Sequence, residues 1–330
     1  MKQKQTGPPK TSRPSSEAEE VGLAAYAYYL PPKTVSLDHL ARAGKLESSA
    51  SVLRSFGFNR AYIAEPPSSS QLAERAVERL FRRCSTQPSD VDAILYSSAL
   101  PVQAPSRSAD PASLFQYPAS SLQHRFGMVR ANTIGISQAG CVSFLSALRL
   151  AADMIRAEPL VHRVLCISCD VLPARVRREV LYNVISDAAC AAIVERGAKR
   201  DRILAWSQVT KGFYGDSAQR KNEIVAAYFP TARFVIHEAL EKARLKLADI
   251  RLIIPHNVNR KSWEILLQIL EARPSQFYGR NIRMRGHTIA ADHVINLQDA
   301  VRAGRIRRGE NVLLFTFGFG AHWACMILQH

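Results

Sequence analysis

A helix–turn–strand unit occurs twice in this chain, and the repeat limits the possible folds more than any other sequence feature. Residues 90–95 read Asp-Val-Asp-Ala-Ile-Leu, and residues 249–254 read Asp-Ile-Arg-Leu-Ile-Ile. Each run follows a stretch whose apolar residues recur at helical spacing. A duplication of such units predicts a mixed α/β fold of two similar halves, with helices on both sides of the sheets. Ligands of such folds bind beyond the carboxyl ends of the strands, where the halves meet.

The same patterns divide the chain into four parts. Residues 1–20 are rich in Lys, Pro, Ser and Glu and nearly free of apolar residues, so they are predicted to form a disordered tail. Residues 21–196 are the predicted first half, and residues 222–330 are the predicted second half. The charged segment between them, residues 197–221, is predicted to be an irregular junction.

Composition and charge exclude several classes of function. The chain has 330 residues, 47% of them hydrophobic, and can bury a large core. It shows no secretory signal and no apolar run that would span a bilayer, so we expect a cytoplasmic protein with reduced cysteines and no membrane partner. The net charge of +16 favours an acidic protein partner or a phosphate-bearing ligand. Nucleic acid is not expected, because the Arg residues are dispersed and no zinc finger, recognition helix or aromatic platform is evident.

Cys141 stands at a predicted strand-to-helix junction. Residues 131–140 are predicted to form a short buried strand that turns tightly at Gly140. Residues 142–155 carry apolar side chains at helical spacing, without Gly or Pro. At the first turn of a buried helix, unpaired N–H groups and the helix dipole favour the thiolate of Cys141 over the thiol. Such a thiolate can attack a thioester and hold the acyl group.

A second pair of cysteines, Cys166 and Cys169, has the spacing C-x-x-C. The pair lies inside residues 164–171, a predicted central strand. Residues three apart on a strand point to opposite faces, and no second pair follows. We therefore predict neither a metal site nor a redox role for this pair.

Two histidines and an aspartate of the second half fall at strand ends or helix starts. His256 follows the apolar run of residues 253–255, where the chain leaves a predicted strand. His287 and Asp292 belong to the turn that corresponds, in the repeat, to the Cys141 turn. A pseudo-twofold axis would bring the two turns face to face. A histidine that reaches Cys141 can act as a general base or hold a developing oxyanion.

A glycine-rich turn, Phe-Gly-Phe-Gly-Ala, occupies residues 317–321. It is not a dinucleotide-binding fingerprint, because Trp323 replaces the last glycine and a predicted strand follows. The turn suits a backbone amide that approaches a ligand closely. We expect an N–H of Gly318 or Phe319, together with the N–H of Cys141, to form an oxyanion hole for a thioester carbonyl.

These motifs, in this order and spacing, resemble ketoacyl-ACP synthase III, a family of the thiolase superfamily. The resemblance covers about residues 21–329. It rests on five motifs, at residues 140–141, 254–259, 286–291, 303–306 and 317–323. It implies a thiolase fold, in which two duplicated βαβαβαββ halves pack as a five-layer α-β-α-β-α sandwich. It also implies a homodimer that takes an acyl group from coenzyme A or from the phosphopantetheine of an acyl carrier protein, with no bound cofactor and no metal.

The resemblance also predicts the lining of the acyl pocket. In the family, the residue matching Tyr117 crosses the dimer interface and lines the pocket of the partner subunit. We expect Tyr117 and Gly320 to line this pocket. Asn257 and Asn259, which flank His256 in the sequence and could orient its ring, are expected there as well.

The chain departs from condensing members of the family at three places. His287 stands where they carry Asn, and Asp292 stands where they carry a small residue. Residues 46–54 lack the Trp that stacks on the adenine of coenzyme A, which favours a carrier protein as donor. A combination of Cys, His and Asp resembles a branch from antibiotic pathways that transfers acyl groups to oxygen, nitrogen or sulfur acceptors.

Three functions remain open from the sequence. In the first, Cys141 carries the acyl group, His256 is the base, and Asp292 or His287 orients it. In the second, His256 and His287 stabilise the enolate of malonyl-carrier protein during a decarboxylating condensation. In the third, the chain is a non-catalytic synthase paralogue that acts as a partner.

Overall fold

The computed structural model describes residues 20–66, 68–100 and 110–330. Except for Glu20, the predicted disordered tail lies outside the described residues. Nine strands are joined in one hydrogen-bonded array, which consists of two sheets of related topology. The sheets meet where β1 (Val21–Tyr29) pairs with β10 (Arg202–Thr210). The predicted α/β fold with two duplicated halves is therefore confirmed.

The first half has the element order βαβαβαββ. Its strands and main helices are β1, α3 (Ser69–Phe81), β4 (Ala93–Ser97), α4 (Pro118–Arg125), β5 (Asn132–Ile136), α5 (Ser143–Ala157), β6 (Arg163–Asp170) and β9 (Ala188–Arg196). The strands lie side by side in the order β5-β4-β6-β9-β1. β4 is parallel to β5 and β6, whereas β9 is antiparallel to β6 and β1.

The second half repeats this plan, except that one strand is reduced to a single bridge. Its elements are β10, α6 (Lys221–Ala243), β11 (Ile250–Pro255), α7 (Arg260–Ile269), α9 (Asp292–Arg302), β12 (Asn311–Gly318) and β13 (His322–Gln329). The strands lie in the order β11-β12-β13-β10. The counterpart of β5 is a single parallel bridge between Ile253 and Phe277.

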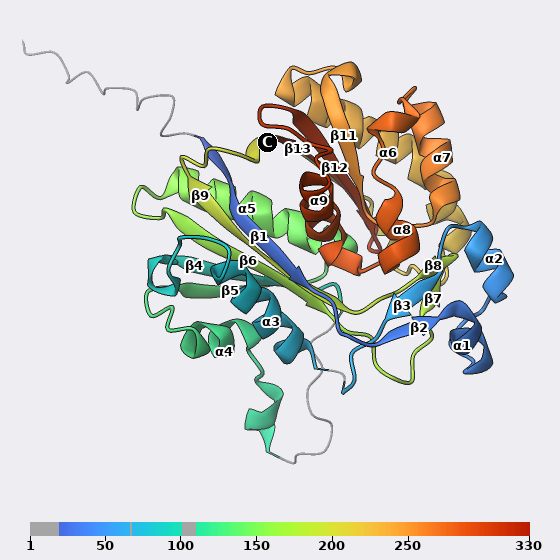
Figure 1. The fold of residues 1–330 in the computed structure, drawn as a ribbon, viewed down its shortest axis with the longest axis horizontal. Coiled ribbons are helices and arrows are strands. Elements are labelled where there is room, and N and C mark those ends of the chain that lie inside the picture. Colours follow the sequence, from blue (N-terminus) through green and yellow to red (C-terminus); the bar gives the residue numbers. More distant parts are fainter. Residues whose placement is uncertain (1–19, 67, 101–109) are drawn as a thin grey trace, which may run out of the picture.

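The structure has five layers, which pack together through three hydrophobic clusters (Figure 1). The central cluster joins α5 and α9 to the inner faces of both sheets, and it includes Leu148 of α5 and Leu297 of α9. α3 and α4 cover the outer face of the first sheet. α6 and α7 cover the outer face of the second sheet. This arrangement is the predicted α-β-α-β-α sandwich.

Short elements form a cap beside the two sheets (Figure 1). They are β2 (Thr34–Ser36), α1 (Leu37–Arg42), α2 (Ala50–Ser55), β3 (Arg60–Tyr62), β7 (Glu179–Val180), β8 (Asn183–Val184) and α8 (Arg280–Arg285). Glu179 joins the two sides of this cap, because its carboxylate accepts hydrogen bonds from the backbone of Glu47 and from Ser48.

Two expectations about local structure are wrong. Residues 197–221 are not irregular throughout, because β10 occupies Arg202–Thr210 with alternating buried and exposed side chains. The charged residues just before β10 conceal this alternation in the sequence. β5 is not buried, since it lies at the edge of the first sheet and its residues are exposed or partly exposed. The apolar side chains of Ile134 and Ile136 favour a buried strand in the sequence, but a single copy of the chain leaves this edge strand exposed.

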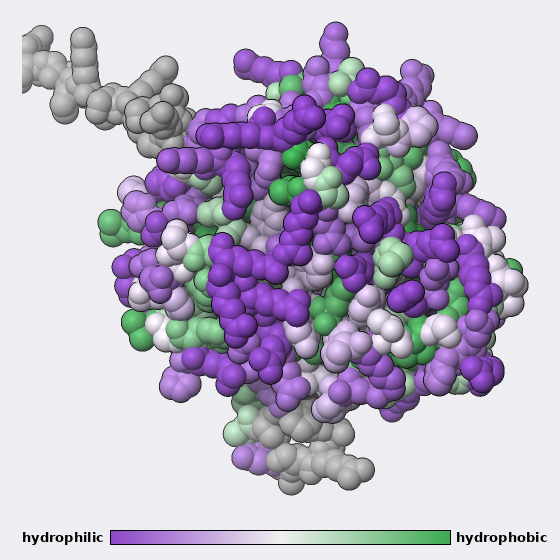
Figure 2. Space-filling view, in the orientation of Figure 1, coloured by the Kyte–Doolittle hydropathy of each residue, from purple (hydrophilic) through white to green (hydrophobic). Residues whose placement is uncertain are grey.

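Hydrophilic residues cover most of the face of the molecule shown in Figure 2, and the hydrophobic residues on it form small, separate groups. Within the described ranges, no helix combines the length and the apolar character that crossing a membrane requires.

The two thiols of the C-x-x-C motif lie on opposite faces of β6, as predicted. Cys166 belongs to the central hydrophobic cluster, and Cys169 belongs to the outer cluster beneath α3. The Sγ atom of Cys166 lies 3.5 Å from the carbonyl oxygen of Ala147, and that of Cys169 lies 3.2 Å from the carbonyl oxygen of Ser69. Burial raises the pKa of both thiols, so both remain protonated packing residues.

A buried ion pair holds the segment that follows β6. Arg178 donates two hydrogen bonds, of 2.8 and 2.9 Å, to the carboxylate of Asp187, which also accepts from the backbone N–H groups of Ala64 and Leu172. Asp187 is 0% exposed and Arg178 only 5%. Loss of either partner would leave a buried charge uncompensated.

We expect Arg178→Met to lower the free energy of unfolding by about 3 kcal/mol or more, because the Asp187 carboxylate would lose its buried partner. Urea denaturation followed by circular dichroism would measure this change. Arg177→Met, at the exposed neighbouring position, is the matched control and should have a small effect. Equal stability of the two variants would contradict the prediction.

Candidate active site

Cys141 lies in a short 3-10 turn, Gly140–Val142, that leads directly into α5. Gly140 has φ of +53°, a conformation that a residue with a side chain adopts only with strain. The carbonyl of Cys141 accepts a hydrogen bond of 3.4 Å from Thr316 of β12. The Cys141 turn is therefore fixed to the second sheet as well as to its own helix.

The glycine-rich turn packs against the backbone of Cys141. A Cβ atom on Gly318 would lie 2.7 Å from the backbone nitrogen of Cys141, and one on Gly140 would lie 2.9 Å from the carbonyl oxygen of Phe319. Contacts this short leave no room for a side chain at either glycine. The structure thus brings together the two turns that were expected to supply the oxyanion hole. Gly320, at the end of the turn, packs against the ring of His322.

A chain of contacts runs from Cys141 to a buried carboxylate. The Sγ atom of Cys141 lies 3.6 Å from Nε2 of His287, and Nδ1 of the same ring lies 2.6 Å from Oδ2 of Asp292. His287 precedes the 3-10 turn Ile289–Ala291, and Asp292 begins α9. The two turns expected to face each other therefore meet at this sulfur–imidazole contact.

The Asp292 carboxylate is 0% exposed and accepts three further hydrogen bonds. The backbone N–H and the hydroxyl of Thr288 donate to Oδ1 at 2.7 and 2.6 Å, and the backbone N–H of Asn257 donates to Oδ2 at 2.6 Å. Charge-assisted hydrogen bonds of this kind compensate a buried carboxylate for its lost hydration. Asp292 is therefore held in one position against the His287 ring.

The charges around His287 favour its protonated form. Burial alone would lower the pKa of His287, but the Asp292 carboxylate and the Cys141 thiolate raise it to about 10. At neutral pH His287 is then an imidazolium, and its positive charge lies 3.6 Å from the sulfur of Cys141. A cation beside a cysteine favours the thiolate, which is the nucleophilic form.

His256 lies beside this group but has different partners. Its Nδ1 accepts a hydrogen bond of 3.4 Å from the backbone N–H of Phe317, and its Nε2 lies 3.4 Å from the hydroxyl of Tyr228. The His256 and His287 rings are perpendicular, with centroids 6.1 Å apart. Asp292 therefore pairs with His287, and the expected support of His256 by Asp292 is not what the structure forms.

The tautomer of His256 follows from these bonds. Burial lowers the pKa of His256 well below its ordinary value, and His287 and His293 lower it further. The ring is therefore neutral, and because Nδ1 accepts from Phe317, the proton resides on Nε2. In this form His256 donates a hydrogen bond from Nε2. The assignment of His256 as the base is corrected to that of a donor.

Asn257 and Asn259 connect loops. The Asn257 amide donates to the carbonyl of Gly286 at 3.0 Å and accepts from Asn296 at 2.8 Å. Asn259 caps α7, and its backbone N–H donates to the side chain of Asn183 at 2.7 Å. Both residues are buried with their amides occupied, so we correct their expected place in the acyl pocket to a supporting one.

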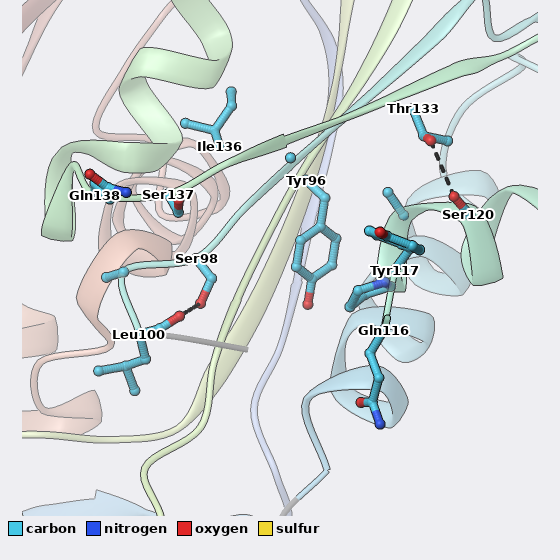
Figure 3. Close-up of a pocket in the computed structure, with 14 residues that line it drawn as sticks. Tyr96, Ser98, Leu100, Gln116, Tyr117, Ser120, Thr133, Ile136, Ser137 and Gln138 are labelled. Carbon is cyan, nitrogen blue, oxygen red and sulfur yellow. Dashed lines mark hydrogen bonds between the residues drawn. The ribbon is translucent and has the colours of Figure 1, made fainter. Parts of the chain in front are cut away.

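A hollow of about 680 Å³ lies between the ends of β4 and β5 and the start of α4. Its lining includes Tyr117 and ends at Gln138, three positions before Cys141. Figure 3 shows the ring of Tyr96 between Tyr117 on one side and Ser98 with Leu100 on the other. Tyr117 is 62% exposed. Of the four residues expected in an acyl pocket, only Tyr117 lines this hollow.

Two polar residues of the site were not predicted from the sequence. Thr288 belongs to the motif at residues 286–291. A hydroxyl residue shortly before an acid that begins a helix was the signal that could have identified it. Tyr228 gave no signal, because it lies in the middle of a long helix between other apolar residues. Only the packing of α6 on the second sheet brings it to His256.

We expect iodoacetamide to alkylate wild-type Cys141 at a rate that changes little between pH 7 and 9, because His287, with its pKa of about 10, keeps a positive charge beside the sulfur over this range. In His287→Ala the positive charge beside the sulfur is absent, so alkylation at pH 7 should fall by about tenfold or more and rise toward pH 9. Mass spectrometry of the Cys141 peptide measures the rate.

His39→Ala, on the exposed surface of α1, is the matched control and should retain the wild-type profile. Asp292→Asn should resemble His287→Ala, since the neutral amide no longer stabilises the imidazolium. A steep pH dependence in the wild type would contradict the ion pair.

Two family models match the chain. The model for the C-terminal region of 3-oxoacyl-[acyl-carrier-protein] synthase III matches residues 240–330, and the model for 3-oxoacyl-[acyl-carrier-protein] synthase III matches residues 137–212. Together they span just over half of the chain. A beta-ketoacyl-[acyl-carrier-protein] synthase III from Methylococcus capsulatus is 26% identical over 331 residues, which cover 93% of this chain and 98% of that protein.

Solved structures show the same fold. The 3-oxoacyl-[acyl-carrier-protein] synthase III of Aquifex aeolicus superimposes with a TM-score of 0.81 at 23% identity, over 94% of this chain and all of that chain. The acyltransferase ChlB3 superimposes with a TM-score of 0.83 at 21% identity, over 94% of this chain and 97% of that chain. The agreement extends over nearly the whole length of the proteins compared. The chain belongs to the 3-oxoacyl-[acyl-carrier-protein] synthase III family and has the thiolase fold.

Proposed function

We propose that this protein is an acyltransferase. Cys141 takes an acyl group from a thioester and passes it to a hydroxyl, amine or thiol acceptor. The observation that carries the proposal is the contact chain from Cys141 through His287 to the buried carboxylate of Asp292. A nucleophile, a histidine in reach of it and an acid that orients the histidine are the parts that acyl transfer requires.

The acylation step begins from the thiolate–imidazolium pair. The Cys141 sulfur attacks the thioester carbonyl, and the backbone N–H of Cys141, together with one from the glycine-rich turn, stabilises the oxyanion. When the carbon–sulfur bond of the donor breaks, its thiolate takes the proton from Nε2 of His287. The enzyme then holds an acyl-cysteine beside a neutral histidine.

The transfer step uses the lone pair that this leaves on His287. Asp292 retains the proton on Nδ1, so Nε2 can accept the proton of the incoming acceptor. The acceptor atom bonds to the acyl carbon, the bond to Cys141 breaks, and the thiolate–imidazolium pair is restored. Protons and charges balance over the two steps.

The same geometry disfavours a decarboxylating condensation. An enolate intermediate needs neutral N–H donors, and His256 offers one from Nε2. Neutral His287, however, presents a lone pair toward Cys141, because Asp292 holds its only proton on the other nitrogen. An enolate would face this lone pair. Condensation remains the alternative because relatives such as that from Methylococcus capsulatus are named synthases.

We propose an acyl carrier protein as the donor. Carrier proteins are acidic, and a chain with a net charge of +16 would attract an acidic protein through long-range steering. No Trp stands in residues 46–54 to stack on the adenine of coenzyme A. The substrate in either case is a phosphopantetheine thioester, and the proposal includes no bound cofactor.

We further propose a homodimer formed through β5. An exposed edge strand presents unpaired backbone groups that a second copy can pair with. Ile134 on β5 is 44% exposed, and the neighbouring Val129 is 79% exposed. In such a dimer, Tyr117 of the partner subunit would help close the hollow beside Gln138.

The mass of the intact protein tests the acyl-enzyme directly. After mixing with a panel of acyl-carrier proteins and acyl-coenzyme A donors, the wild type should gain the mass of one acyl group, and Cys141→Ala should gain none. Addition of malonyl-carrier protein should release no carbon dioxide and form no new carbon–carbon bond. No mass gain with any donor would leave the non-catalytic paralogue, and carbon dioxide release would favour the condensing synthase.

We expect Ile134→Asp to shift the protein from dimer to monomer, because a charge on β5 would be buried against the second copy. Light scattering after size-exclusion chromatography measures the mass. Leu160→Asp, at an 85% exposed position away from β5, is the matched control and should remain dimeric. A wild-type monomer, or a dimer in both variants, would argue against the β5 interface.

A further inference from the structure

Tyr228 is a polar residue of the site that the steps above do not use. It lies on α6, and its hydroxyl oxygen is 3.4 Å from Nε2 of His256. Its ring makes edge contacts with Phe229, Phe315 and Phe317, at centroid distances of 5.0, 6.3 and 5.4 Å. Three perpendicular neighbours hold the ring in one orientation. The side chain is nevertheless only partly buried.

The direction of hydrogen bonding at Tyr228 follows from His256. Phe317 donates to Nδ1 of His256, so Nε2 carries the proton and donates to the Tyr228 oxygen. A phenol has one O–H to donate, and this donor is then free for another partner. Burial raises the pKa of Tyr228 above its ordinary value, which keeps the hydroxyl protonated. Tyr228 therefore offers a fixed O–H donor beside His256.

We propose that Tyr228 is the residue that binds the acyl acceptor and selects an alcohol as that acceptor. This role rests on the proposed acyl transfer and on the number of lone pairs that the attacking atom carries. The attacking atom uses one lone pair to bond to the acyl carbon and gives its proton to Nε2 of His287. An alcohol oxygen has a second lone pair, which can accept the hydrogen bond from Tyr228.

An amine cannot accept the hydrogen bond from Tyr228 in the same step. Its nitrogen has one lone pair, and attack on the acyl carbon uses it. The Tyr228 O–H would then be left without a partner in a partly dry site, which opposes the reaction. A thiol is a poor hydrogen-bond acceptor and gains little from Tyr228. The product class that follows is an ester.

The reaction balances with the groups already described. The O–H bond of the alcohol breaks, and its proton passes to Nε2 of neutral His287. The alcohol oxygen bonds to the acyl carbon, and the bond from that carbon to the sulfur of Cys141 breaks. The thiolate and the imidazolium are restored, and Tyr228 keeps its proton throughout.

The test follows decay of the acyl-enzyme, formed beforehand with octanoyl-N-acetylcysteamine or with the best donor from the mass panel. Three acceptors with one carbon skeleton are compared: 2-phenylethanol, 2-phenylethylamine and 2-phenylethanethiol. Decay in water alone is subtracted. For the wild type, decay should be fastest with the alcohol. Tyr228→Phe should slow that reaction by about tenfold and change the amine reaction by less than about threefold.

The ratio of alcohol to amine rates is the decisive quantity, because damage to the fold would lower both rates together. In Tyr228→Phe, the rate of acylation at Cys141 should stay near that of the wild type. If the wild type itself is not acylated, the proposed acyl transfer is overturned instead. Phe234→Leu, at a 58% exposed position of α6, is the matched control and should preserve the ratio.

Several outcomes would overturn the role of Tyr228. They are a wild-type enzyme that prefers the amine or the thiol, acceptor rates no higher than the rate in water, and an unchanged ratio in Tyr228→Phe. If Tyr228→Phe does not fold, as judged by circular dichroism, the ranking of the three acceptors by the wild-type enzyme still decides between an alcohol and the other classes.

Discussion

The geometry of the site depends on the buried carboxylate of Asp292. It accepts hydrogen bonds from the backbone of Asn257, from both donors of Thr288 and from the ring of His287. These donors come from the loop after β11 and from the turn before α9, so one charged group joins two segments of the second half. Removing the charge would release the His287 ring and the loop that follows His256. The carboxylate is thus both a structural connection and the source of the charge on His287.

The duplicated fold explains why Cys141 and this acid lie on either side of His287. α5 and α9 are equivalent helices of the two halves, and both lie in the central layer (Figure 1). Each begins after a short 3-10 turn, with Cys141 in the first turn and Asp292 directly after the second. Helix N-termini stabilise negative charge, so one half can hold a thiolate and the other a carboxylate. His287 lies between them and takes the opposite charge.

The two histidines of the site differ because their hydrogen-bond partners differ. His287 pairs with a carboxylate and a thiolate, which favour the imidazolium. His256 is surrounded by aromatic rings and a backbone N–H, which favour the neutral ring. In the proposed transfer, His287 exchanges a proton with the substrates, while His256 keeps its proton and donates a hydrogen bond. This division fits acyl transfer better than it fits an enolate held between two equal donors.

The sequence by itself determined the two-half α/β fold, the position of Cys141 before a helix and the glycine-rich turn beside it, because periodicity, turn residues and short motifs are local properties of the chain. It also brought His287 and Asp292 into the candidate site. Only the tertiary structure decided that Asp292 supports His287, that Asn257 and Asn259 connect loops, that β5 is exposed and that Tyr228 reaches His256. Those facts depend on which side chains meet across layers, and spacing along one chain does not encode the direction of a hydrogen bond between two residues far apart in it.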